Sequence, residues 1–100
     1  MKPRIYIAGP MTGYPNFNRE AFNAKAVNLL SNGFTPLNPA TLPDGLTQSQ
    51  YMDICFAMIR AADGIHLLKE WEKSKGALAE LAYAEKLELT ITMDSGDPLF

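Results

Sequence analysis

The sequence contains only one cysteine, Cys55, and only one histidine, His66. A single cysteine excludes a disulfide within the chain, and a free thiol is typical of proteins that work in a reducing cytosol. With so few nitrogen and sulfur ligands, no spacing in the chain would hold a metal ion. We therefore expect a cytoplasmic protein that uses no metal and no other cofactor.

An excess of basic residues and long apolar segments are also missing. The formal net charge of the 100 residues is −2, so the chain lacks the positive field that binds a DNA or RNA backbone. The apolar run Ile5–Ala8 is too short for the core of a signal peptide. No stretch approaches the roughly 18 apolar residues of a membrane span. We expect neither long nucleic acid nor a membrane as a partner.

The length fits one domain, and the share of hydrophobic residues, 47%, is ordinary for a folded globular protein. We expect residues 1–93 to form this single domain and residues 94–100 to be a loose tail.

Strand-favouring and helix-favouring segments alternate along the chain. Strands are predicted at residues 4–8, 34–37, 64–68 and 89–93, and helices at residues 17–31, 49–62 and 76–87, with Asn16 or Asn18 as the cap of the first helix. This order predicts an α/β fold, with a four-stranded parallel sheet, right-handed crossovers and helices on both faces. Pro36 favours an edge position for the second strand.

Three loops follow the carboxyl ends of the predicted strands, at residues 9–16, 38–47 and 69–75. In open parallel sheets, ligands bind beyond these ends, where the strand order reverses. The loops hold most of the glycine, proline and serine residues and the single tryptophan, Trp71. The segment Gly9–Gly13 lacks the glycine spacing of a dinucleotide fingerprint or a P-loop, so it is a weak phosphate signal.

The start of the predicted third helix can be interpreted in two ways. Ser74 followed by Gly76 places a hydroxyl and free N–H groups at a helix N-terminus, which favours an anion. Serine is also a common helix cap with no ligand.

Glu80, one turn further on, is either a carboxylate that a ligand can approach or a solvated residue of the first turn. Tyr6 is either a buried tyrosine whose hydroxyl needs a partner or plain strand packing. His66 is expected to be a strand residue satisfied by its neighbours, and Asp53 an acid that favours a helix start.

Two sets of residues resemble the nucleoside 2-deoxyribosyltransferase-like superfamily. They are Ile5-Tyr6-Ile7-Ala8-Gly9-Pro10-Met11 and the series Asp63, Trp71, Ser74-Lys75-Gly76 and Glu80, and the resemblance runs from about residue 3 to 92. Within the superfamily, the chain is most similar to a short DUF4406-like branch of bacteria and phages, related to 2′-deoxynucleoside 5′-phosphate N-hydrolases. The resemblance implies a flavodoxin-like (Rossmann-like) three-layer sandwich with strand order 2-1-3-4, and a homo-oligomer, here a dimer through the second and third helices.

The resemblance also implies roles for individual residues. In the superfamily, the glutamate at the position of Glu80 attacks the anomeric carbon of deoxyribose, and the tyrosine at the position of Tyr6 orients it. The serine at the position of Ser74 contacts the phosphate in the hydrolase branch, whereas transferases carry an aspartate there. The further substrate-binding residues expected are Gly9, Pro10, Met11, Gly13, Trp71 and Gly76.

The chain departs from the superfamily pattern at two positions. Cys55 stands where an aspartate binds the sugar hydroxyl, and Thr12 stands where the phosphate-binding branch has an arginine. A thiol is a poor acceptor compared with a carboxylate. Two functions therefore stay open: cleavage or transfer at the N-glycosidic bond of a nucleoside or nucleoside 5′-monophosphate, or nucleotide binding without turnover. A pure protein-interaction module is a third alternative, against which the clustered loop residues argue.

Overall fold

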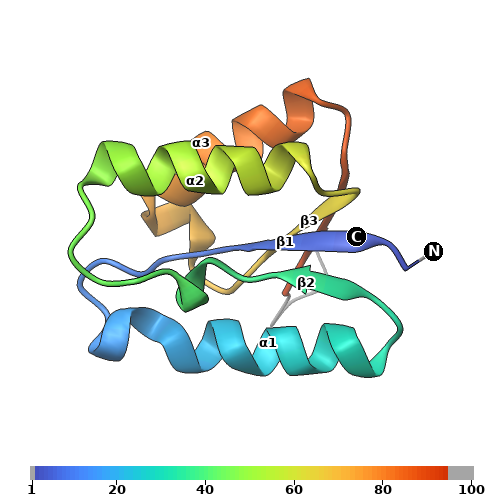
Figure 1. Ribbon diagram of the computed structural model, residues 1–100, viewed down its shortest axis with the longest axis horizontal. Helices are drawn as coiled ribbons and strands as arrows, with labels where there is room; N and C mark the ends of the chain where they lie inside the picture. Colours follow the sequence, from blue (N-terminus) through green and yellow to red (C-terminus); the bar gives the residue numbers. More distant parts are fainter. Residues whose placement is uncertain (1, 95–100) are drawn as a thin grey trace.

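A computed structural model describes residues 2–94 of the chain (Figure 1). The strands are β1 (Arg4–Ala8), β2 (Thr35–Leu37), β3 (Gly64–Leu67) and β4 (Thr90–Met93); the α-helices are α1 (Arg19–Ser31), α2 (Gln48–Arg60) and α3 (Lys75–Lys86); short 3₁₀ turns are η1 (Pro15–Asn18), η2 (Pro39–Thr41) and η3 (Trp71–Lys73). The expected tail lies outside the described residues except for Asp94. None of the described helices is long and apolar enough to cross a membrane.

The strands form one parallel sheet with the order β2-β1-β3-β4. This confirms the α/β prediction and the strand order that the resemblance implied. The proline-containing strand β2 lies at an edge, as expected, because proline cannot donate a ladder hydrogen bond. In Figure 1, α1 packs below the sheet, whereas α2 and α3 pack above it.

Successive residues of β1 point into two different core layers. Tyr6 and Ala8 belong to the first core cluster, between the sheet and the pair α2 and α3, together with Cys55, Ile59, Ala62, Ile65, Leu67 and Ala84. Ile7 belongs to the second core cluster, between the sheet and α1, together with Phe22, Leu29, Ala40 and Leu68. The central strand is therefore buried on both faces.

The helix α2 begins where the sequence provides a capping box. The Thr47 side chain accepts a hydrogen bond from the Gln50 N–H, and the Gln50 side chain accepts one from the Thr47 N–H. Its start agrees with the predicted helix to within one residue.

The predicted start of the first helix is wrong. Three consecutive residues, Asn16, Phe17 and Asn18, have φ of 49°, 54° and 61°, so the chain is left-handed where a helix was expected. Asparagine tolerates this conformation better than most residues. Asn18 precedes α1 but forms no side-chain cap, because its Nδ2 donates to the carbonyl oxygen of Pro10 at 2.9 Å.

Helices cover both faces of the sheet, as expected, although α1 does not reach across β4 on its face. The side chains of Thr90 and Thr92 lie on the α1 side of β4, and both residues are exposed. One helix cannot cover four strands, and threonine is a residue that suits a solvated sheet face.

Candidate active site

The candidate site contains a buried hydrogen bond between the middle of the sheet and α3. The Tyr6 hydroxyl donates to Oε2 of Glu80 at 2.8 Å. Tyr6 is fully buried, and Glu80 is only 7% exposed. Glu80 faces the sheet because it shares one side of α3 with the buried residues Ala77 and Ala84. The alternatives of a solvated glutamate and of plain strand packing for Tyr6 are therefore both wrong.

Burial makes the Glu80 carboxyl a weak acid. It raises the pKa of Glu80 to about 7, and the hydrogen bond from Tyr6 and the nearby Cys55 thiol oppose part of that rise. Burial and the neighbouring Glu80 raise the pKa of Tyr6 well above its ordinary value, so its hydroxyl remains a neutral donor. At neutral pH, both the acid and the base form of this carboxyl are therefore populated.

Cys55 is the third member of this polar group. It is buried in α2, and burial raises the pKa of its thiol to about 11, so it stays protonated. Asp53, two residues earlier, is exposed, as expected from its rotation around the helix. Where the superfamily has an aspartate, this chain therefore places a neutral thiol beside Tyr6 and Glu80.

The N-terminus of α3 has the ordinary serine cap. The Ser74 hydroxyl accepts a hydrogen bond from the Ala77 N–H at 3.1 Å. Gly76 lies beside it, and a Cβ built there would lie 3.9 Å from the sulfur of Met52 in α2. Because Gly76 has no side chain, the start of α3 can lie close to Met52, near the start of α2.

Two of the expected first-loop residues, Gly9 and Met11, pack on the α1 side of the sheet, away from Glu80. A Cβ at Gly9 would lie 2.9 Å from the Cβ of Leu68, so this glycine is required for close packing on the α1 side. Met11 also packs against the second core cluster. Pro10 is buried, and Gly13 is exposed with φ of 85°.

Two apolar residues from other loops at the carboxyl edge pack against the same core cluster as Tyr6. Trp71, in the turn after β3, and Leu42, in the loop after β2, pack against the cluster that contains Tyr6 and Cys55. The sequence pointed to Trp71 but gave no reason to select Leu42, whose only signal is its place in a carboxyl-end loop. Within residues 2–94, no group of three histidine, cysteine or acidic residues could hold a metal ion.

Comparisons with known proteins agree with this architecture. The family model described as "Domain of unknown function (DUF4406)" matches residues 3–93. A solved structure of a 2-desoxiribosyltransferase from Leishmania mexicana is similar, with a TM-score of 0.76 and 25% identity over 95% of this chain. This chain spans 65% of that protein's length. A search of curated proteins gave no match.

Proposed function

The chain belongs to the DUF4406 family, and from that premise and its deoxyribosyltransferase-like fold we propose that it acts on an N-glycosidic bond. The substrate class is a nucleoside or a nucleoside 5′-monophosphate. The observation that carries the proposal is the buried pair of Tyr6 and Glu80. Burying a carboxyl costs free energy of folding, and carboxyls in such surroundings are concentrated at functional sites.

In the proposed reaction, Glu80 is the nucleophile. Its Oε2 is held by the Tyr6 hydroxyl, which leaves Oε1 to attack the anomeric carbon of the sugar. The bond from that carbon to the base nitrogen breaks, the base leaves with the bonding electron pair and takes a proton, and a glycosyl ester forms on Glu80. Attack by water or by a second base releases the sugar and restores the carboxylate.

The substrate requires an opening that the structure does not show. At 7% exposure, Glu80 cannot touch an anomeric carbon unless neighbouring groups move. Trp71 and Leu42 are candidates for this movement because both lie in loops at the carboxyl edge and pack against the core cluster that contains Tyr6. As the single tryptophan, Trp71 would report such an opening by its fluorescence.

The test is release of base from a panel of nucleosides, 5′-monophosphates and NAD, followed by chromatography. Wild type is compared with Glu80→Gln and with Glu85→Gln, which removes the same charge from an exposed position of α3. We expect release by wild type and by Glu85→Gln, and none by Glu80→Gln. Equal release by all three proteins would contradict the assigned nucleophile.

A second function, nucleotide binding without turnover, is favoured by one specific observation. Cys55 places a neutral thiol beside Tyr6 and Glu80, where the sugar hydroxyl would be held by a stronger acceptor in the superfamily. In that case a nucleotide raises the melting temperature of the wild-type protein, while no base is released over hours.

A further inference from the structure

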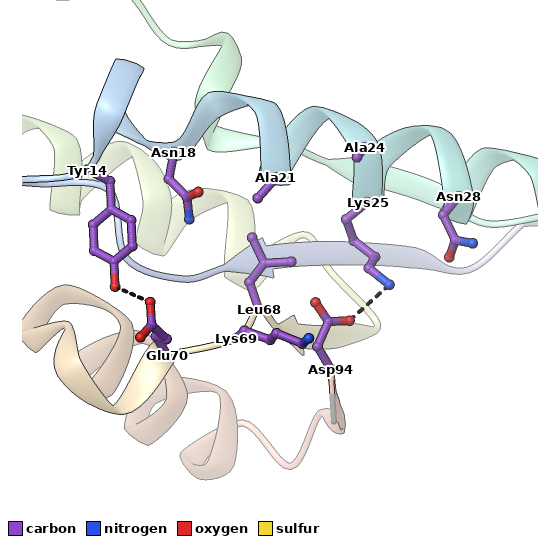
Figure 2. A pocket seen from close by; sticks show the side chains of 10 residues that line it. All are labelled: Tyr14, Asn18, Ala21, Ala24, Lys25, Asn28, Leu68, Lys69, Glu70 and Asp94. Atoms are coloured by element: carbon purple, nitrogen blue, oxygen red, sulfur yellow. Dashed lines mark hydrogen bonds and ion pairs between the residues drawn. The ribbon is translucent and has the colours of Figure 1, made fainter. Parts of the chain in front are cut away.

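A cavity of about 390 Å³ lies on the α1 side of the sheet, on the face opposite to the Glu80 pair (Figure 2). Helix α1 forms one wall. The residues that follow β3, together with Asp94 at the end of β4, form the other. The volume lies within the range of small-molecule sites. The cavity lies between α1 and the residues that follow β3 and β4, at the carboxyl edge of the sheet, where ligands bind in open parallel sheets.

The centre of this cavity is apolar and shallow. Ala21 and Ala24 of α1 face Leu68 across it. The alanines leave space that larger side chains would fill, and Leu68, only 3% exposed, closes the cavity opposite to them. A flat ring fits these surroundings better than a hydrated polar group, because it would cover apolar surface without leaving donors unpaired.

One end of the cavity carries a fixed cationic group. Lys25 Nζ lies 3.0 Å from Oδ1 of Asp94, and the same oxygen lies 2.8 Å from Nε2 of His66. The other ring nitrogen of His66 lies 2.8 Å from the Thr92 hydroxyl. The side chains of Lys25 and Asp94 are only 20% and 26% exposed. This network holds the Lys25 ammonium group at the cavity wall, and Lys69 extends along the cavity toward the same end (Figure 2).

The opposite end is closed by a hydrogen bond between two loops. The Tyr14 hydroxyl donates to Oε1 of Glu70 at 2.7 Å, and Lys73 Nζ lies 2.6 Å from Oε2 of Glu70. Glu70 is thereby neutralised by a lysine outside the cavity. Asp94 is matched by Lys25, so among residues 2–94 the ammonium group of Lys69 remains as a positive charge that favours an anion.

We propose that this cavity binds a small organic anion made of a flat ring and one carboxylate or phosphate monoester group. The ring lies against Ala21 and Ala24 with the buried Leu68 behind it, and the anionic group lies beside Lys69. The site shares no residue with the Tyr6 and Glu80 pair, so it stands independently of the proposed reaction.

The test is a titration of the ¹⁵N-labelled full chain with four probes, followed by amide chemical shifts. Phenyl phosphate and benzoate each carry a ring and an anion, inorganic phosphate carries only the anion, and benzyl alcohol carries only the ring. We expect saturable shifts with phenyl phosphate, benzoate or both, located at residues 21–28 and 68–70. Which of the two binds more tightly identifies the anionic group.

Two variants test the location of the site. Ala24 is exposed, so Ala24→Leu fills the cavity without disturbing the core, and Lys69→Met removes the cationic end. Each is expected to weaken binding at least tenfold. Ala79→Leu and Lys86→Met make the same changes at exposed positions of α3 and are expected to bind as wild type.

Four results would overturn the proposal. Inorganic phosphate or benzyl alcohol binding as tightly as the two-part probes contradicts the ligand class. Unchanged affinity in Ala24→Leu and Lys69→Met contradicts the location, as do shifts confined to the surroundings of Glu80. Absence of saturable shifts with both ring anions contradicts the site itself. None of these results depends on base release, so the proposed reaction is judged separately.

Discussion

Replacing Glu80 with glutamine should stabilise the protein at alkaline pH while removing the proposed nucleophile. Burial raises the pKa of this carboxyl from its ordinary 4.5 to about 7. Below pH 4.5 the carboxyl is protonated in both the folded and the unfolded protein, so its burial costs no ionisation energy. As the pH rises from 4.5 to about 7, the unfolded state gains by ionising and the free energy of unfolding falls. Glutamine keeps the size and the acceptor oxygen for Tyr6 but never ionises.

The magnitude follows from the size of the pKa shift. A rise of the pKa from 4.5 to about 7 corresponds to about 3 kcal/mol of lost stability at pH 8, and to less than about 1 kcal/mol at pH 5. With an m-value of about 1–3 kcal/mol/M, Glu80→Gln should raise the urea midpoint at pH 8 by about 1–3 M.

The assay is urea unfolding followed by the fluorescence of Trp71 at several pH values between 5 and 8. Glu85→Gln is the matched control, since Glu85 is exposed on the same helix, and its midpoint should stay close to that of wild type throughout. If Glu80→Gln shifts the midpoint by the same amount at pH 5 and pH 8, the carboxyl is not destabilised by burial and the reasoning fails.

Three further predictions concern other features of the structure. Tyr6→Phe removes a hydrogen bond that lowers the pKa of Glu80, so the rise of base release with pH should move to higher pH; an unmoved pH profile would contradict the orienting role. Gly9→Ala should destabilise the protein by about 1–3 kcal/mol in urea unfolding, because its Cβ would lie 2.9 Å from a neighbouring atom. Gly76→Ala should be neutral or stabilising by up to about 1 kcal/mol, because the nearest atom to its Cβ lies at 3.8 Å. If the chain is a homodimer through α2 and α3, Leu78→Glu should give a monomer in light scattering, since Leu78 is 44% exposed on α3; a wild-type monomer would reject this assembly.

The sheet could be predicted because its strands are short apolar segments separated by glycine, proline and asparagine. The strand order came from the resemblance, since the pattern of elements alone does not determine it. The start of α1 could not be predicted, because Phe17 gives no sign that it adopts a left-handed conformation. That conformation is imposed by the loop around it, including the bond from Asn18 to Pro10.

The chemical state of the candidate site was beyond sequence reasoning for a different reason. Position in a helix favours an exposed glutamate, and only the packing of α3 against β1 brings Glu80 to Tyr6, 74 residues earlier. The cavity on the other face was not predicted at all. Its ion pair joins Lys25 to Asp94 through the tertiary fold, and neither residue belongs to a motif.

The alternation of β1 between two core layers has a consequence for how the chain folds. Tyr6 reaches the carboxyl on one side, and its neighbours Ile5 and Ile7 point to the other. If β1 paired with β3 one residue out of step, an isoleucine would face Glu80, and a buried carboxyl would lose its donor while a tyrosine entered an apolar layer. Misaligned pairing is therefore disfavoured by polar as well as apolar contacts, and the tyrosine assigned to the site also selects the register of the central strand.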